Sequence, residues 1–142
     1  MAQKERPQED VLAVRSLQQK GAGRMKVRRD KVDKLFSKVI HLRDKICQAC
    51  GKSSGLLDAA HLLSRRYAAT RWDTANALLL CRRDHMRFTQ NPEEWVRFVE
   101  SRIGKEGYRI LEIRAKHATT KKHFARETAE VVLTRVIKEL GG

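Results

Sequence analysis

Three cysteines place the strongest constraint on how this chain can fold. Cys47 and Cys50 form a Cys-x-x-Cys pair followed by Gly51, and Cys81 ends an apolar run. A tight turn lets the two thiolates of such a pair bind one Zn²⁺, and the glycine relieves the turn. A redox pair is the alternative, but it usually follows a strand, whereas a basic helical pattern precedes this pair. The cysteines therefore predict a zinc knuckle with Cys81 as third ligand, although a buried apolar role also suits Cys81.

The fourth zinc ligand stays open at the level of sequence. In a paired-knuckle arrangement it stands three residues after Cys81, at Asp84. Aspartate is an accepted but less common zinc ligand. His85, one residue further on, would complete a Cys₃His site instead. A site that binds zinc weakly or not at all is the third alternative.

The chain is strongly basic, which restricts its partners. Its 142 residues include 31 Lys and Arg against 17 Asp and Glu, for a net charge of +14. Such a surplus repels itself and favours a polyanionic partner. Nucleic acid is the first candidate, because neutralised phosphates release condensed counterions. A membrane surface is less favoured, because no segment combines a basic face with exposed aromatic anchors.

The sequence predicts a cytoplasmic protein of one compact domain. No apolar stretch approaches the length needed to span a bilayer, and residues 1–7 lack the apolar core of a signal peptide. In a reducing compartment, cysteines serve metal binding or packing rather than disulfides.

Apolar residues recur at helical spacing over much of the chain. Residues 31–46 predict an amphipathic helix. A second helix begins at Pro92 and ends near Gly104. A third covers about 106–115, and a fourth about 123–140. The side chains expected to be buried are Val32, Leu35, Phe36, Val39, Ile40, Trp95, Phe98, Val99, Ile103, Tyr108, Leu111, Ala129, Val132, Leu133, Val136, Ile137 and Leu140, with Ile110 as a further candidate.

Residues 1–29 are predicted to form a peripheral, partly flexible basic arm with one short helix near residues 11–17. From Lys20 to Lys31 there are six basic residues and one acid, and glycines loosen the backbone. A solvated tail and a DNA-contacting arm explain this pattern equally well. In the second case the candidate DNA contacts are Arg24, Lys26, Arg28 and Arg29.

Three polar residues accompany the cysteines. His61, Asn76 and His85 lie 15 and then 9 positions apart. A lone histidine is more often a structural residue than a catalyst, and such spacings alone mean little. Their position among three candidate zinc ligands gives them more weight.

Residues 47–90 resemble the HNH nuclease family, and within it the zinc-knuckle group with phage members. The stretch Ala60-His61-Leu62-Leu63-Ser64-Arg65, with Arg71-Trp72-Asp73, Asn76 and Cys81, is similar to phage recombination nucleases of the NinG (Rap) type, which act on branched DNA. The resemblance implies a small central ββα-metal (HNH) finger of two antiparallel strands and a helix. With the helices that periodicity predicts, the expected fold is mainly α, of the α+β class. We expect a single nuclease domain over residues 30–142, with helices at 31–46 and 92–140 flanking the core at 47–90.

The resemblance also implies roles for individual residues. His61 matches the general base at the end of the first strand, and Asn76 matches the asparagine that holds the loop and the base. His85 matches the helix residue that binds a catalytic divalent cation, Mg²⁺ or Mn²⁺. The matches to the structural Zn²⁺ ligands are Cys47, Cys50 and Cys81, and Asp84 stands where the fourth cysteine usually stands.

The second metal ligand of many HNH enzymes is missing from its usual place. Ala60 occupies the position before the base, where the family often has Asp or His. Asp58 lies two positions earlier and so on the same face of a strand, from which it could approach the metal. Asp58 as an exposed turn acid is the alternative. In that case His85, phosphates and water hold the ion, which Mg²⁺ tolerates well.

Arginines surround this segment and suit bidentate contacts with phosphates. The candidate DNA contacts in the core are Arg65, Arg66, Arg71, Arg82, Arg83 and Arg87, although a solvated basic face explains some of them. Trp72 is interpreted as a packing anchor rather than a base-stacking residue. Met86 and Phe88 are expected in the core.

Together these features predict a metal-dependent HNH endodeoxyribonuclease that hydrolyses phosphodiester bonds, on branched or recombination-intermediate DNA and in the host cytoplasm if a phage encodes it. A non-catalytic zinc-knuckle DNA-binding module is one alternative, and a sequence-tolerant nickase linked to phage packaging is another. A basic RNA-binding protein would explain the charge but not the three polar residues. A homodimer is the arrangement expected of an enzyme that cuts junctions in pairs.

Overall fold

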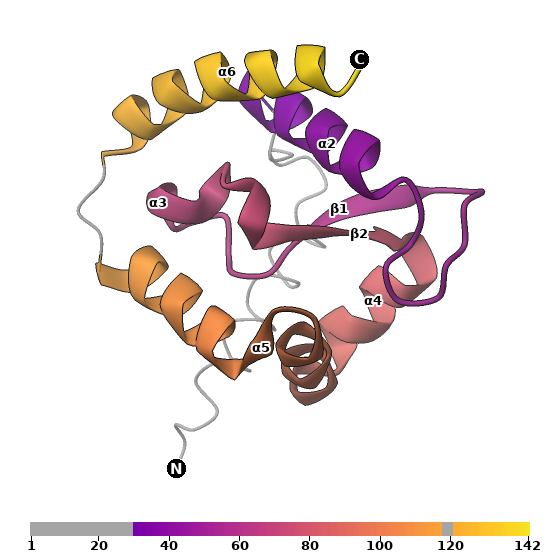
Figure 1. The fold of residues 1–142 in the computed structure, drawn as a ribbon. Coiled ribbons are helices and arrows are strands. Elements are labelled where there is room, and N and C mark those ends of the chain that lie inside the picture. The colour runs from indigo at the N-terminus through magenta and orange to yellow at the C-terminus, as the bar shows by residue number, and fades with distance from the viewer. Residues whose placement is uncertain (1–29, 118–120) are drawn as a thin grey trace, which may run out of the picture. The chain divides into compact units, whose positions relative to one another are not determined.

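A short antiparallel hairpin lies at the centre of the fold, with helices on both sides (Figure 1). The computed structural model describes residues 30–117 and 121–142. Strand β1 (Leu57–His61) pairs with β2 (Ala77–Cys81), so that Leu57 lies opposite Cys81 and His61 opposite Ala77. The part from Lys31 to Gly142 is one compact unit.

Helices make up most of the described chain. They are α2 (Lys31–Asp44), α3 (Ala68–Arg71), the 3-10 turn η1 (Thr74–Asn76), α4 (Arg82–Gln90), α5 (Pro92–His117) and α6 (Lys122–Glu139). The only sheet among the described residues is the two-stranded hairpin. A mainly helical α+β fold with a small two-stranded centre is therefore confirmed.

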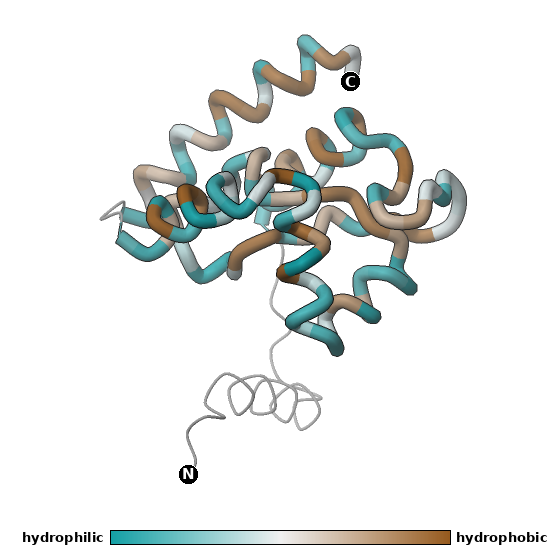
Figure 2. The backbone as a smooth tube through the Cα atoms, turned by 60° about the horizontal axis from the view of Figure 1, so that its bottom comes forward, coloured by the Kyte–Doolittle hydropathy of each residue, from teal (hydrophilic) through white to brown (hydrophobic). Residues whose placement is uncertain are grey.

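The two faces of the hairpin pack against different helices, because successive side chains of a strand point to opposite sides. Leu79 of β2 joins Phe36 and Ile40 of α2 and Leu133 of α6 in one buried cluster. On the other face, Leu80 joins a second cluster of buried residues, Cys47, Ala60, Cys81 and Phe88. Figure 2 shows hydrophilic and hydrophobic residues interspersed along the helices, as expected for helices that bury one face.

The C-terminal end of α2 is fixed to β2 by polar contacts. The Leu79 backbone N–H donates to Asp44 Oδ2 at 2.9 Å, and Arg43 Nη2 donates to the Ala77 carbonyl at 2.8 Å. Arg43 also forms an ion pair with Asp44 at 2.7 Å. These contacts complement the apolar packing of α2 on the hairpin.

Gly104 divides α5 into two helical segments, as the sequence predicts. Its φ of 82° and ψ of 158° are not helical, and a positive φ favours glycine over other residues. Past the break, Leu111 is buried and Tyr108 is partly buried, whereas Ile110 is 49% exposed.

Three residues predicted to be buried are exposed instead. Met86 is 54% exposed, Val132 is 50% exposed and Leu140 is 44% exposed. Met86 lies two positions from buried Phe88, so it points away from the face of α4 that packs inward. Val132 lies one position before buried Leu133 and five before buried Ile137, so its side chain lies off the buried face of α6. Leu140 follows the last residue of α6. Trp72 is 6% exposed and packs in the core, as expected of an anchor.

The predicted basic arm, with Arg24, Lys26, Arg28 and Arg29 and the short helix near 11–17, lies outside the described residues. Within the described part, none of the helices has the length and apolar character that a membrane crossing requires.

The packing of α2 can be tested by one substitution made at two sites. Val39 is 2% exposed and Val131 is 62% exposed, and both lie in helices. Val39→Ala should lower the free energy of unfolding by about 2 kcal/mol, because it removes two buried carbons and leaves a cavity. Val131→Ala should change it by less than about 0.5 kcal/mol in the same urea titration. Equal effects would contradict the described packing.

Candidate active site and metal centre

The Cys47–Cys50 pair sits in a tight turn that is attached to β2. The Cys47 N–H donates to the Lys52 carbonyl at 2.9 Å, and the Gly51 N–H donates to the Cys47 carbonyl at 2.8 Å. Gly51 has a φ of 82°, which explains the glycine at this position. The Gln48 N–H donates to the Leu79 carbonyl at 2.8 Å, so the turn extends the hairpin edge.

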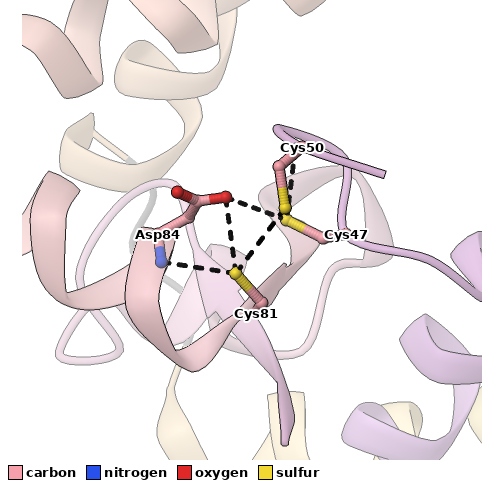
Figure 3. A group of neighbouring side chains, drawn as sticks. All are labelled: Cys47, Cys50, Cys81 and Asp84. Carbon is pink, nitrogen blue, oxygen red and sulfur yellow. Dashed lines mark hydrogen bonds between the residues drawn. The ribbon is translucent and has the colours of Figure 1, made fainter. Parts of the chain in front are cut away.

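The turn brings both cysteines against the point where β2 passes into α4 (Figure 3). Ligand atoms of Cys47, Cys50, Cys81 and Asp84 all lie within 4.8 Å of one another. The Cys50 and Cys81 sulfurs are 3.8 Å apart, and Asp84 Oδ2 lies 3.4 Å from the sulfurs of Cys47 and Cys81. A tetrahedral zinc requires about 3.8 Å between sulfurs and about 3.5 Å between sulfur and oxygen. The four residues therefore fit one small divalent ion.

The donor set is also electrostatically suited to a cation. The Lys52 backbone N–H favours ionisation of Cys50, but the Asp84 carboxylate, burial and the neighbouring sulfurs oppose it and raise the pKa of the Cys50 thiol to about 11. A bound cation would reverse this balance, because it favours thiolates over thiols. Backbone N–H groups of Ala49 and Asp84 already donate to the sulfurs of Cys47 and Cys81 at 3.4 Å.

The fourth position of this cluster is occupied by Asp84 rather than His85. Asp84 is 3% exposed and points at the sulfurs. The ring of His85 lies beside Asp58 instead, with Nδ1 at 3.0 Å from Asp58 Oδ2. Of the two alternatives for a fourth ligand, the geometry favours Asp84.

His61 ends β1 and is held from the α2 side. Its ring stacks on Phe36, with centroids 4.9 Å apart and planes 16° apart. Its Nε2 lies 2.8 Å from the Arg71 carbonyl oxygen. A carbonyl can only accept a hydrogen bond, so Nε2 carries the proton and Nδ1 carries the lone pair. Burial lowers the pKa of His61, because it disfavours the charged ring, and this effect outweighs the hydrogen bond to the Arg71 carbonyl, which raises the pKa. The neutral ring is therefore favoured.

Asn76 is fully buried and holds the connection between the two strands, residues 62–76, which includes α3 and η1 and is called the loop from here on. Its Oδ1 accepts from the Leu63 N–H at 2.8 Å. Its Nδ2 donates to the Leu63 carbonyl at 3.1 Å and to the Thr70 carbonyl at 2.9 Å. One amide therefore satisfies three backbone groups of the loop that follows His61, and buried groups of this kind need such partners.

His85 projects from α4 and pairs with a carboxylate of β1. Asp58 accepts from His85 Nδ1 and from Arg82, whose Nε lies at 2.9 Å and Nη2 at 3.0 Å. These two donors outweigh the desolvation of Asp58 and lower the pKa of its carboxyl. With Nδ1 turned to Asp58, the other ring nitrogen, Nε2, makes no hydrogen bond among the described residues. This arrangement suits metal binding through Nε2.

One open pocket connects the two histidines. Its lining residues are Ala60, His61, His85, Phe88, Thr89 and Trp95. Ala60 lies between the histidines in this lining and contributes only a methyl group. The pocket thus combines two imidazoles with an apolar wall at the end of the hairpin.

The candidate DNA-contacting arginines fall into two groups. Arg83 is the most exposed of those on α4, with 77% of its side chain accessible, and Arg82 and Arg87 are about half exposed. Arg65 and Arg66 lie in the loop after His61, where Arg66 contacts Tyr67. Arg71 differs, because its side chain is only 14% exposed and its guanidinium binds Asp33 at 2.8 Å. Arg71 therefore contributes to the fold rather than to a DNA-contacting surface.

Sequence reasoning did not single out Asp33, and it interpreted Phe36 only as a core residue. Asp33 is 6% exposed and accepts from Arg71 and from the Trp72 indole. An acidic residue in the first turn of a helix is ordinarily explained by the helix dipole. No local signal marks it as the partner of a loop 38 residues away.

Comparison with known proteins agrees with part of this picture. Residues 47–91, about a third of the chain, match the family model of the HNH endonuclease. This segment contains His61, Asn76, His85 and the four clustered metal-ligand candidates. The match supports the HNH family and a nuclease function in general terms. No curated protein and no solved structure matches the chain.

The role of Asn76 in the loop can be tested directly. Asn76→Ala should lower the free energy of unfolding by about 2 kcal/mol or more, because it leaves buried backbone groups without partners. Amide hydrogen exchange at Leu63 should accelerate in the folded state. Asn91→Ala is the control, since the side-chain amide of exposed Asn91 donates to the Arg87 carbonyl at the end of α4, far along the chain from Leu63. Unchanged exchange at Leu63 would contradict this role.

Proposed function

We propose that this chain is a metal-dependent HNH endodeoxyribonuclease, with the HNH match at residues 47–91 as the premise. One observation carries the proposal: His61 and His85, from different elements, line the same pocket. Asn76 fastens the loop that joins the two strands. A general base and a metal-binding imidazole at one pocket suit metal-assisted hydrolysis of a phosphodiester.

His61 is the general base in this proposal. Its Nε2–H is engaged by the Arg71 carbonyl, so Nδ1 is the nitrogen that can take a proton from water. Burial keeps the ring neutral at neutral pH, because it lowers the pKa of His61. The water attacks the phosphorus in line with the 3′-oxygen, and the bond between the phosphorus and the 3′-oxygen breaks. The products then carry a 5′-phosphate and a 3′-hydroxyl.

His85 is the proposed protein ligand of the catalytic cation, Mg²⁺ or Mn²⁺. Asp58 holds its Nδ1, and a carboxylate that orients a histidine also makes its other nitrogen a better ligand. Ala60 supplies no ligand, so DNA phosphates and water would complete the coordination. Asp58, the other candidate ligand, instead has its two oxygens on His85 Nδ1 and Arg82. When bound, the cation would neutralise the scissile phosphate and stabilise the leaving oxygen.

Zn²⁺ is the proposed ion of the cysteine cluster, where it has a structural role. Three sulfurs and one carboxylate oxygen within 4.8 Å of one another suit zinc better than Mg²⁺, which prefers oxygen ligands. The ion would join the turn at residues 47–51 to the start of α4. It would thereby fix His85, which follows Asp84 directly.

The proposed DNA surface comprises Arg65 and Arg66, which follow His61, and Arg82, Arg83 and Arg87, which flank His85 on α4. A net charge of +14 supports a polyanionic substrate. We propose branched DNA as the first substrate class to test, on the resemblance of residues 60–81 to phage recombination nucleases. A symmetric dimer making paired nicks, a monomeric nickase and a non-catalytic DNA-binding module are alternative outcomes of the experiment below.

Purified protein should nick or linearise supercoiled plasmid in Mg²⁺ or Mn²⁺ and cut four-way junctions in the same buffer. EDTA should abolish cleavage. His61→Ala should lower the single-turnover rate roughly 10²- to 10⁴-fold, because the base is lost. The matched control is His117→Ala at the exposed end of α5, which should cleave at the wild-type rate. Tight binding without cleavage of either substrate in any metal would overturn the nuclease function in favour of a binding module.

The acidic limb of the pH profile gives a second check on His61. A base acts when it is unprotonated, so cleavage should rise with pH through the pKa of His61 and stay level above it. Because burial lowers this pKa, the midpoint should lie below the ordinary imidazole value of 6.5. A midpoint above 6.5 would argue against His61 as the base.

The zinc site predicts a graded response to substitution at Asp84. The wild type should contain about one zinc per chain by elemental analysis, and Cys81→Ser should lose most of it. Asp84→Cys should retain zinc against a higher chelator concentration than the wild type, whereas Asp84→Asn should release it at a lower one. Asp58→Asn is the control and should keep its zinc. A wild type that neither contains zinc nor gains thermal stability from it would contradict the assignment.

A further inference from the structure

The buried carboxylate of Asp33 in α2 binds the side chains of two consecutive loop residues, Arg71 and Trp72. Asp33 Oδ1 accepts from Arg71 Nε at 3.2 Å and from Trp72 Nε1 at 2.9 Å, and Oδ2 accepts from Arg71 Nη2 at 2.8 Å. The Arg71 guanidinium also lies over the Trp72 ring, 4.8 Å from its centroid. The peptide unit between Arg71 and Trp72 is therefore held from both sides.

The carbonyl of that same peptide unit is the partner of the proposed base. Arg71 O accepts from His61 Nε2 at 2.8 Å, which fixes the tautomer of the ring. The orientation of the imidazole thus depends on where the Arg71–Trp72 peptide lies, and Asp33 is one of the groups that hold this peptide. The contacts form a chain from Asp33 through Arg71 to His61.

A second residue of α2 fixes the plane of the ring. Phe36 lies on the same helix face as Asp33, three positions on, and is 2% exposed. Its ring stacks on the His61 imidazole at 4.9 Å. The hydrogen bond to Arg71 and the stacking on Phe36 together restrain both the direction and the plane of the imidazole.

We infer that α2, which lies outside the HNH-matching segment, is part of the active site, with Asp33 and Phe36 as positioning residues for His61. The inference rests on the proposed nuclease function. Stability alone is a poor reason for the Asp33–Arg71 pair, because buried ion pairs are often no more stabilising than apolar packing of the same volume. What such a pair does provide is one defined position for the groups it holds.

The decisive experiment compares two carboxylates of α2, one buried and one partly buried. Asp33 has a side chain 6% exposed and reaches the His61 loop, whereas Asp44 has one 10% exposed and binds Leu79 and Arg43. Asp33→Asn should lower the single-turnover cleavage rate about 10- to 100-fold, because small misplacements of a catalytic group cost this much. DNA affinity in EDTA and Mn²⁺ affinity should stay within about twofold. Asp44→Asn should cleave at nearly the wild-type rate even if both variants lose similar stability.

A double variant separates positioning from general loosening of the fold. If Asp33 acts through His61, Asp33→Asn should have no further effect on the residual cleavage of His61→Ala, because effects of residues that act as a unit are not additive. A merely structural role would lower the residual rate again. Should Asp33→Asn fail to fold, Phe36→Leu provides the same test, with Val39→Ala as its control on the same helix.

Nitrogen NMR of the His61 ring supplies a readout that does not depend on cleavage. The wild type should show a single tautomer with the proton on Nε2, and Asp33→Asn should show a mixture. The charged groups that act on this ring are Asp33 of α2 and Arg65 and Arg71 of the loop. The inference alone would be overturned if the wild type cleaves DNA, Asp33→Asn cleaves it equally fast, and the tautomer of the His61 ring is the same in both proteins. A wild type that cuts no DNA would instead overturn the proposed function.

Discussion

The register of the two-stranded hairpin is the constraint on which the rest of the structure depends. Because side chains alternate along a strand, this register turns Ala60 toward α4 and α5 while Leu79 packs against α2. It also places Cys81 where β2 passes into α4, beside the turn that carries Cys47. A slip of one residue would exchange the two faces. The metal cluster and the pocket therefore depend on a single set of backbone hydrogen bonds.

Among the described residues, three of the four buried polar or charged side chains lie at or beside the two proposed sites. Asp33, Asn76 and Asp84 are each at most 6% exposed, and each has several partners. Burying a charge or an amide is costly unless its hydrogen bonds are made. At these three positions the fold buries a hydrogen-bonded polar group instead of an apolar one, which gives the neighbouring groups a defined position. Asp33 lies near the proposed base, Asn76 in the loop and Asp84 at the cysteine cluster.

The flanking helices have different relations to the HNH-matching segment. Helix α2 contacts His61 through Phe36 and the loop through Asp33, while Trp95 of α5 forms part of the pocket wall. A match over residues 47–91 therefore includes the residues proposed to act in chemistry, but only some of those that hold them in place.

The sequence by itself determined the features that depend on neighbours along the chain. Helical periodicity predicted α2, α6 and the break at Gly104, and the spacing of Cys47, Cys50 and Cys81 predicted that their sulfurs converge. Tertiary structure alone decided which helix faces meet. In the tertiary structure Met86 is exposed to solvent, and Asp84 rather than His85 lies beside the sulfurs. The tertiary structure also joined Asp33 to a loop 38 residues away. The physical reason is that periodicity is a property of local backbone geometry, whereas these contacts depend on how separate elements pack in space.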